Sequence, residues 1–336
     1  MSIYLGIDIG ASTVKLGLFE PEQGVIGARL DRPSSASEGP DATVNVIKTA
    51  TSELLAANEL QFQDLKAIGA CCPAPIDASG MCVYPTNIDP SWQGVNIAQK
   101  LSGDLQLPAF LLNDGDAAAY REYRIREAQN KASSVMAQFI TGTGLGGALI
   151  VNGKIWSAPS VSAELGHICI DSSENADLCG CGARGCVETR ASLLGLRNMV
   201  KHRQAKGNVP EALQGEPMEV AKNLRRLGQM DDPLSDVGAI WQEYFTSLGI
   251  AARNLINTIG CDLIVISGGA QEQEKTASDG AYQRFKQDAI AWIRQEIDHS
   301  FPHLTQTRVE WSIDTLLDSA AYGAAQYASV RGNSKS

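Results

Sequence analysis

The sequence predicts a duplicated α/β fold, in which two similar lobes face each other across a cleft. Short apolar runs typical of strands alternate with longer segments of helical apolar spacing along the chain. A strand, a small-residue turn and a second strand open the chain, and this pattern recurs near residue 135. At 336 residues the chain is long enough for two domains of roughly 100–200 residues each. We expect the ligand of such a protein in the cleft between the lobes.

The first half of the chain is predicted to form a small lobe, residues 1–115. Its strand candidates are short apolar runs, and its helix shows apolar residues at helical spacing behind Asp41, a suitable N-cap. The predicted strands cover residues 3–10, 14–20, 25–32, 65–72 and 108–114, with a helix at 41–60 and a proline-punctuated loop at 73–92.

The second half is predicted to form a large lobe, residues 116–315, which carries the cysteine-rich segment described below. After a helix at 116–128, two strands within 135–156 are split by a glycine turn. Further helices are expected at 188–203, 236–257 and 281–298, strands at 262–269 and 308–313, and exposed loops without chemistry at 208–218 and 270–281. A closing helix at 316–331 is expected to pack back on the small lobe.

Composition and charge exclude several classes of function. The net charge of −10 argues against a nucleic-acid surface, because a phosphate backbone is bound by clusters of Lys and Arg. No uncharged apolar run approaches the ~20 residues of a membrane span, and the opening segment meets Asp8 too early for a secretory signal. We therefore expect a cytoplasmic protein with no membrane or nucleic-acid partner. In a reducing compartment its eight cysteines are expected to be thiols or metal ligands.

Two glycine-rich turns offer backbone N–H groups to a phosphate. The stretch GTGLGG, residues 142–147, satisfies G-x-G-x-x-G, but a dinucleotide site needs a helix after the turn and a strand follows here. A hairpin with uncovered N–H groups remains, and DIGAST, residues 8–13, offers a second. Taken singly, each turn is a plain hairpin. Together with SGG at 267–269, they suggest a nucleotide held between the two lobes.

Asn113 and Asp114 stand where a predicted strand gives way to a helix, which leaves two interpretations open. Either residue is a good helix N-cap. A carboxylate at the end of a buried strand is also a general base, which phosphoryl transfer to a sugar hydroxyl requires, while Mg²⁺ and backbone donors handle the phosphate charge. Asp8 likewise either binds Mg²⁺ through water or holds a turn.

The segment HICIDSSENADLCGCGARGCVE, residues 167–188, predicts a structural zinc site. The Cys₃His set of His167, Cys179, Cys181 and Cys186 is typical of a closed tetrahedral site. A disulfide would leave one thiol over and need an oxidising compartment, and a redox pair is normally C-x-x-C. The other cysteines lie in or beside apolar runs and are expected in the core. They are Cys71, Cys72, Cys82, Cys169 and Cys261.

These motifs together resemble those of the ROK family of sugar kinases, in the actin-like (ribonuclease H-like) ATPase superfamily, along nearly the whole chain. LGIDIGASTVKLGL is similar to the first phosphate segment of the family, FLLNDGDAAA to its catalytic segment and ITGTGLGGALIVNGK to its second phosphate segment. SAELGHI with CGCGARGCVE is similar to its sugar-and-zinc signature. The resemblance implies a kinase that uses ATP and Mg²⁺, with Asp114 as the general base.

The resemblance also assigns the binding residues. Sugar hydroxyls would be bound by Asn113, Glu164, His167 and Glu188, and Asn87 would lie in a loop that closes on the sugar. The zinc would be structural and would fix His167 and the chain leading to Glu188. The nucleotide would be bound by Asp8, Gly10, Ser12, Thr13 and Lys15 in the first half, and by Thr141, Gly142, Thr143, Gly144, Gly268 and Gly269 in the second.

The chain departs from the family pattern in two places. Ala11 replaces a glycine of the usual D-I-G-G-T-K, and Ala74 stands where Pro-Gly is common. Neither change removes a charged catalytic group, so we expect activity. N-D-x-D at 113–116 is similar to the glucokinase branch, which favours glucose, converted to glucose 6-phosphate. Because epimers differ by one hydroxyl, other hexoses stay open. They are fructose, mannose, allose, N-acetylmannosamine and N-acetylglucosamine.

A non-catalytic sugar sensor is the alternative class of function, since fold does not fix function. Some members of the family are sugar-responsive repressors with a DNA-binding domain ahead of the kinase-like part. The first core strand here is expected to begin at Ile3, which leaves no room for such a domain, and the acidic composition agrees. A kinase is therefore preferred. The family also suggests a homodimer.

Overall fold

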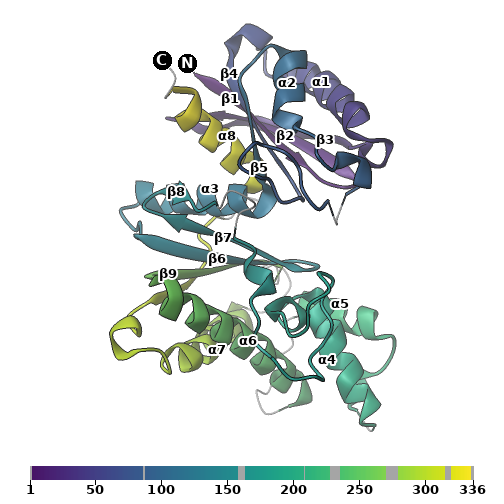
Figure 1. The fold of residues 1–336 in the computed structure, drawn as a ribbon, viewed down its shortest axis with the longest axis vertical. Helices are drawn as coiled ribbons and strands as arrows, with labels where there is room; N and C mark the ends of the chain where they lie inside the picture. The colour runs from purple at the N-terminus through teal and green to yellow at the C-terminus, as the bar shows by residue number, and fades with distance from the viewer. Residues whose placement is uncertain are drawn as a thin grey trace. The chain divides into compact units, whose positions relative to one another are not determined.

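The computed structural model describes residues 2–85, 88–157, 163–207, 209–227, 235–269, 279–314 and 319–333. The chain divides into two compact units and contains two five-stranded sheets (Figure 1). Unit 1 consists of Met1–Ala132, Ala148–Ala163 and Ile313–Ser336, and unit 2 of Ser133–Gly147 and Glu164–Ser312. The two-unit α/β architecture is confirmed, while the division at residue 115 stays a prediction.

The first sheet has the strand order β3-β2-β1-β4-β5. β1 pairs antiparallel with β2 and parallel with β4, which pairs parallel with β5. The carboxyl ends of β1, β4 and β5 therefore lie at the same end of the sheet. The strands are β1 (Ile3–Ile9), β2 (Thr13–Glu20), β3 (Gly24–Pro33), β4 (Leu65–Cys72) and β5 (Ala109–Asn113).

The two faces of this sheet pack against different helices. Odd-numbered residues of β1 from Ile3 to Ile9 are buried in a core with α1 (Pro40–Ala57) and α2 (Ile97–Leu105). On the other face, Tyr4 packs in a cluster with Tyr322 of α8 (Ser319–Asn333), the neighbour of α3 (Asp114–Ala128). Gly6 and Gly69 let α8 approach the sheet closely, because a Cβ on either would overlap a backbone carbonyl of that helix.

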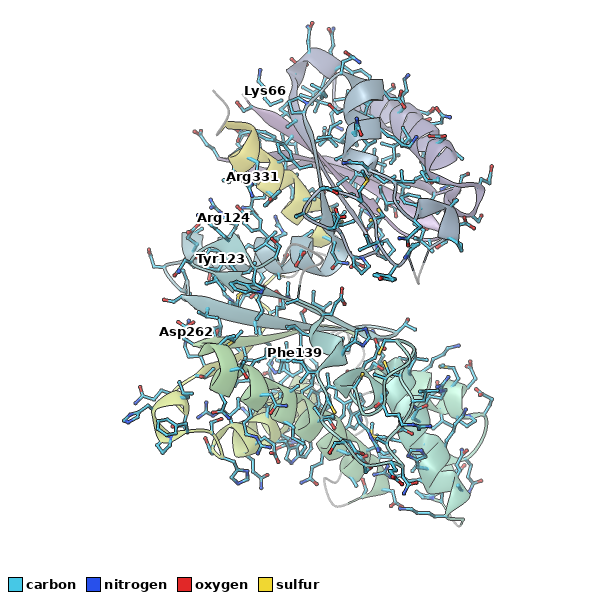
Figure 2. All side chains as sticks on the ribbon, in the orientation of Figure 1. Lys66, Tyr123, Arg124, Phe139, Asp262 and Arg331 are labelled. Atoms are coloured by element: carbon cyan, nitrogen blue, oxygen red, sulfur yellow. The ribbon has the colours of Figure 1, made fainter. Side chains whose placement is uncertain are left out.

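The second sheet has the order β10-β9-β6-β7-β8, with β9 parallel to both of its neighbours. Asp262, at the start of β9, accepts hydrogen bonds from the N–H groups of Ser134 (3.0 Å) and Val135 (2.7 Å) and so fixes where β6 begins. Asp262 and the buried Phe139 of β6 are labelled in Figure 2. The strands are β6 (Val135–Thr141), β7 (Leu145–Val151), β8 (Lys154–Ile155), β9 (Leu263–Gly268) and β10 (Arg308–Trp311).

The core of unit 2 is aromatic. Phe245 stacks on Trp241 and meets Phe285 and Trp311 edge-on, with ring centroids 5.5–6.0 Å apart. Such pairs add about 0.5–1.5 kcal/mol each beyond the area that they bury. The helices of this unit are α4 (Leu193–Ala205), α5 (Pro217–Leu227), α6 (Asp236–Ile259) and α7 (Asp279–Ile297). No helix in the described part of the chain has both the length and the apolar character to cross a membrane.

Two helices are missing from the sequence prediction. α2 follows its N-cap Asn96 and repeats an apolar residue at every fourth position, a signal that could have identified it. α5 begins with Pro217 as its first residue, inside the stretch 208–218 that was expected to be an exposed loop. Leu213 of the same stretch is fully buried, so the loop prediction is wrong there. The helix expected from 188 begins only at Leu193, behind the N-cap Ser192.

Candidate active site

The carboxyl ends of the parallel strands of unit 1 bring two acidic positions together. Asp8 on β1 lies opposite Cys71 on β4, and Cys72 lies opposite Asn113 on β5, one residue before Asp114. Burial raises the pKa of the Cys71 thiol well above its ordinary value, and the negative charges of Asp8 and Asp114 raise it further. Asp8 and Asp114 therefore both lie close enough to the Cys71 thiol to raise its pKa. In a parallel sheet this end of the strands is where ligands usually bind.

Asn113 and Asp114 have separate positions at the start of α3. Asn113 is the N-cap, and its Oδ1 accepts a hydrogen bond from Gly115 N at 2.9 Å while its Nδ2 donates to Ala74 O at 3.3 Å. Asp114 is the first residue of the helix, and its Oδ1 also accepts from Gly115 N, at 2.8 Å. A carboxylate in the first turn is stabilised in its charged form by the helix dipole. The N-cap of α3 is therefore Asn113, and the role of Asp114 as a general base stays a prediction.

The first predicted phosphate turn, residues 8–13, is held by hydrogen bonds to Ser34. Gly10 N donates to Thr13 O at 2.9 Å, and Ser34 binds the turn twice, through its hydroxyl to Ala11 O (2.9 Å) and its N–H to Ser12 O (3.0 Å). Because a trans peptide carries its C=O and N–H on opposite sides, the N–H of Ser12 points away from Ser34. Next to the turn, the ammonium of Lys15 lies 3.0 Å from the Asp8 carboxylate.

The second phosphate turn, in unit 2, is held in the same way. Gly142 O accepts from Leu193 N at 3.1 Å and Thr143 O from Leu194 N at 3.2 Å, so the N-terminus of α4 binds both carbonyls. The N–H groups of Thr143 and Gly144, which follow these carbonyls, point to the opposite side. Two adjacent N–H groups on one side form an anion-binding concavity. A strand, β7, follows the turn, as predicted.

Glu188 connects this turn to the cysteine-rich segment. Its Oε2 accepts from Leu145 N at 2.9 Å, and its Oε1 lies 3.4 Å from Cys179 Sγ. Gly144 is required beside it, because a Cβ there would overlap the Glu188 carboxylate. Partial removal from water raises the pKa of the Glu164 carboxyl, and the nearby Glu188 raises it further, while His167 lowers it. The three predicted sugar ligands of unit 2 are therefore neighbours.

The four predicted zinc ligands lie together. One donor atom from each of His167, Cys179, Cys181 and Cys186 is within 4.8 Å of all the others. His167 Nδ1 is 3.6 Å from Cys179 Sγ, and the sulfurs of Cys181 and Cys186 are 3.7 Å apart. In a tetrahedral zinc site with Zn–S bonds of about 2.3 Å, the sulfurs are separated by roughly 3.8 Å. The kind and number of these donors, and these two separations, therefore fit a tetrahedral zinc site.

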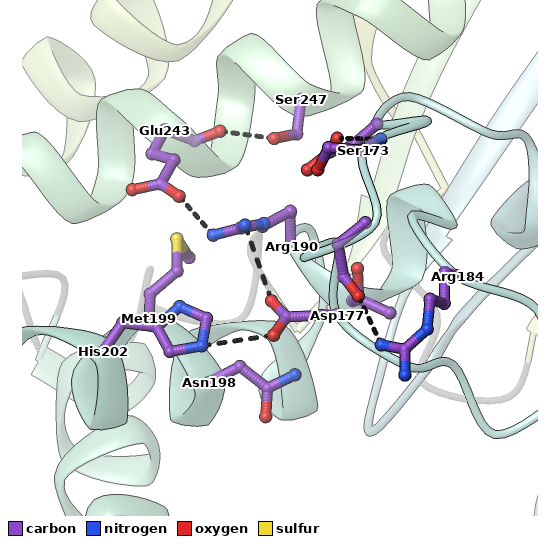
Figure 3. A network of polar contacts seen from close by, with 12 residues as sticks. Ser173, Asp177, Arg184, Arg190, Asn198, Met199, His202, Glu243 and Ser247 are labelled. Carbon is purple, nitrogen blue, oxygen red and sulfur yellow. Dashed lines mark hydrogen bonds and ion pairs between the residues drawn. The ribbon is translucent and has the colours of Figure 1, made fainter. Parts of the chain in front are cut away.

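The loop that carries these cysteines is anchored to two helices by ion pairs (Figure 3). Asp177 lies 3.6 Å from Arg190 and 3.2 Å from Nε2 of His202 on α4. Arg190 in turn pairs with Glu243 of α6 at 2.7 Å, and Arg203 pairs with the same carboxylate at 3.2 Å. A network of this kind holds the loop in one position relative to α4 and α6.

The remaining predicted residues have mixed outcomes, and one residue in contact with the second turn was not predicted. Asn87 lies outside the described residues. Cys169 is exposed, so its assignment to the core is wrong, whereas Cys71, Cys72, Cys82 and Cys261 are buried. Arg225 was not predicted at all, although its Nη1 donates to Gly142 O at 3.0 Å. No sequence signal marked Arg225, because it belongs to none of the motifs and lies on α5, which was not predicted.

The chain is similar in sequence to one protein family and to several known proteins. The family model described as ROK family matches residues 4–301. A glucokinase of Halalkalibacterium halodurans is 28% identical over 296 residues, which cover 85% of this chain and 86% of the relative. A xylose repressor of Bacillus spizizenii is 26% identical over 266 residues, which cover 78% of this chain and 63% of the repressor.

Solved structures show the same fold. A ROK hexokinase from Thermus thermophilus superposes with a TM-score of 0.74 at 21% identity, covering 98% of this chain and 99% of the other. A ROK family glucokinase from Streptomyces griseus, in complex with glucose and AMPPNP, superposes with a TM-score of 0.72 at 21% identity, with coverage of 98% and 99%.

Proposed function

The chain belongs to the ROK family, and on this premise we propose that it is an ATP-dependent sugar kinase that transfers the γ-phosphoryl group to a hexose hydroxyl. The observation that carries the proposal is the separation of tasks at β5 and α3. Asn113 caps the helix, and the adjacent Asp114 carboxylate lies at the carboxyl end of the parallel strands with Asp8 nearby. That arrangement supplies a base without sacrificing the cap.

The proposed reaction is an in-line transfer. The hydroxyl oxygen of the sugar attacks the γ-phosphorus, the bond to the β,γ-bridging oxygen breaks, and ADP leaves with that electron pair. Asp114 accepts the hydroxyl proton. Mg²⁺ bound with ATP would neutralise phosphate charge, and Asp8 would hold it through water. Backbone N–H groups of the two glycine turns would bind the phosphates, with Thr13, Lys15, Thr141 and the Gly268–Gly269 turn beside them.

Sugar hydroxyls would be bound by Asn113 in unit 1 and by Glu164, His167 and Glu188 in unit 2, with Asn87 as a further ligand. Two features support this role. Glu188 is fixed by Leu145 N, so its carboxylate is positioned before a sugar arrives. His167 directs Nδ1 toward the cysteine sulfurs, which leaves Nε2 to bind a hydroxyl.

The metal of the Cys₃His set is proposed to be structural zinc. Four protein ligands close a tetrahedral site and leave no position for a substrate. The ion would supply no chemistry to the transfer. It would fix the ring of His167 and the chain that leads to Glu188. Both side chains would then be oriented toward the sugar.

Glucose is proposed as the substrate because the sequence N-D-G-D at 113–116 is similar to the glucokinase branch, and a glucokinase is among the relatives. The decisive experiment measures sugar-dependent ADP release with glucose, fructose, mannose, allose, N-acetylmannosamine and N-acetylglucosamine. The highest kcat/KM is expected for glucose. A higher value for another hexose would replace glucose but keep the kinase, and no release with any sugar would overturn the kinase.

A sugar-responsive regulator is the second candidate, which the similarity to xylose repressors supports. Such a protein would bind sugar but release no ADP. Calorimetric titration with the same sugars, run beside the ADP assay, therefore separates the two functions. The proposed partners are otherwise ATP, the hexose and a second copy of the chain as a homodimer, with no nucleic acid or membrane. Thiol ligands need a reducing compartment, which supports a cytoplasmic location.

A further inference from the structure

Arg225, on α5, contacts both glycine turns of unit 2. Its Nη1 donates a hydrogen bond to Gly142 O at 3.0 Å. Its guanidinium also lies directly against Gly269, because a Cβ at that position would overlap the Nη2, Cζ and Nε atoms of Arg225. One side chain thus joins the turn after β6 to the turn after β9.

The two turns are themselves in contact, so Arg225 completes a single surface. Gly269 N donates to Thr141 O at 2.7 Å. Gly268 has a left-handed φ of 86°, and a Cβ on it would overlap the same Thr141 carbonyl. Glycine is needed at 268 for the backbone conformation, whereas at 269 it is needed to leave room for the guanidinium.

The charge of Arg225 is not matched by a protein carboxylate within the described part of the chain, where none lies within ion-pair distance. The side chain is partly buried, so its charge is only partly screened by water. Arginine is the side chain best suited to phosphate groups, because its planar fork presents several N–H donors at once. An anionic ligand at the glycine turns would therefore be attracted by the positive charge of Arg225.

We propose that Arg225 is a nucleotide-positioning residue. It holds the Gly142 peptide from the carbonyl side, so that the N–H of Thr143 faces the phosphates, and its positive charge acts on them across the turn. The proposal rests on the proposed kinase function, and it adds a residue that neither the family motifs nor the glycine turns indicate.

The test compares Arg225→Met, which keeps the length of the side chain but removes its charge and donors, with Arg225→Lys. ADP binding is measured by calorimetry in the presence of Mg²⁺, and sugar binding is measured separately with the sugar that the wild type phosphorylates. Arg225→Met loses the charged hydrogen bond that holds the Gly142 peptide. We therefore expect its ADP affinity to be weaker by about 10–100-fold. The ADP affinity of Arg225→Lys should lie between those of the wild type and Arg225→Met. The sugar affinity of both variants should stay within about twofold of the wild type.

Arg197→Met is the matched control, because Arg197 lies on α4 and its guanidinium donates hydrogen bonds to the side chain of Asn198. It should bind ADP like the wild type. Gly269→Ala provides an independent test, because its methyl group displaces the guanidinium. Arg225→Met should then cost little further ADP affinity in the Gly269→Ala background, since contacting residues are not additive.

Two results would overturn the role of Arg225. One is a folded Arg225→Met protein that binds ADP as tightly as the wild type. The other is an equal loss of ADP and sugar affinity in both Arg225 variants, which would indicate a structural role only. A wild-type protein that binds no ADP would instead overturn the kinase function, so the two failures are distinguishable.

Discussion

Single residues at the start of α3 carry the central mechanistic claim. Asp114→Asn removes the proton acceptor but leaves the cap, which is Asn113. We expect a fall in kcat and in kcat/KM together, by about 10²–10⁴-fold, because a general base acts in the transition state. Sugar affinity should change little. Steady-state kinetics and calorimetry on the same preparation check both statements.

The control for this prediction is the neighbouring residue. Asn113→Ala should lower the free energy of unfolding by about 1 kcal/mol, the usual value of an N-cap, whereas Asp114→Asn should not. If Asp114→Asn stays folded, binds sugar and turns over at a rate near that of the wild type, Asp114 is not the base. Glu164 and Glu188 would then be the remaining carboxylates near the proposed sugar position.

Gly144 offers a second single-residue test, on the sugar side. A methyl group in Gly144→Ala would overlap the carboxylate of Glu188 and push it away from Leu145 N. We expect sugar affinity, measured without nucleotide, to weaken by about tenfold or more, because a positioned charged ligand is lost. Gly146→Ala on the same hairpin is the control, since a Cβ there meets no atom within 4 Å. Equal sugar affinities in the two variants would remove Glu188 from the sugar site.

At the level of elements, the cysteine-rich loop is the part whose position we propose to depend on a metal. We expect one zinc per chain by elemental analysis, and a loss of zinc in Cys181→Ser because a tetrahedral site needs all four ligands. Cys169→Ser is the matched control, because Cys169 is an exposed cysteine outside the ligand set and should leave the metal in place.

Metal removal should also weaken sugar binding more than ADP binding. His167 is a predicted ligand of both the metal and the sugar, and Glu188 contacts Cys179. The first glycine turn is held by Ser34, and the second is also held by α4 and by Arg225. Calorimetry before and after treatment with a chelator measures both affinities. Parallel losses would contradict the idea that the metal organises the sugar site alone.

On the scale of the whole chain, α3 ties the segment before α8 into unit 1. The ion pair of Glu122 and Arg126 (2.6 Å) is fully buried, and the Glu122 carboxylate also accepts from the N–H groups of Ile313 (3.2 Å) and Asp314 (3.1 Å). The carboxylate of Asp314 lies 2.9 Å from Arg121. Residues almost 200 positions apart are therefore joined by buried charges.

We expect Glu122→Gln to lower the free energy of unfolding by about 3–5 kcal/mol, because the mutation removes the negative charge that pairs with the fully buried Arg126. Glu127→Gln is the control on the same helix. Its pair with Arg124, a residue labelled in Figure 2, is partly exposed and should contribute less than about 1 kcal/mol. Chemical denaturation of the three proteins gives the comparison. Similar stabilities would show that the buried pair does not hold the segment.

The amino-acid order was sufficient for many features that depend on neighbouring residues. Apolar runs located the strands of both sheets, and the close spacing of Cys179, Cys181 and Cys186 predicted that their sulfurs lie together, because a short loop brings such residues together in any fold. The strand-to-helix junction at Asn113 and Asp114 was also predicted, although their division into cap and first helical residue was not.

Contacts between distant segments were decided only by the folded chain. The bond from Leu145 N to Glu188 and the placement of Arg225 over Gly269 join residues more than 40 positions apart. Such pairs form because sheets and helices pack in one arrangement, and no local period or spacing encodes that arrangement. α5 is the clearest case. It is a short helix that begins with proline in a polar stretch, and the contacts of Arg225 exist only once folding has brought the two glycine turns beside it.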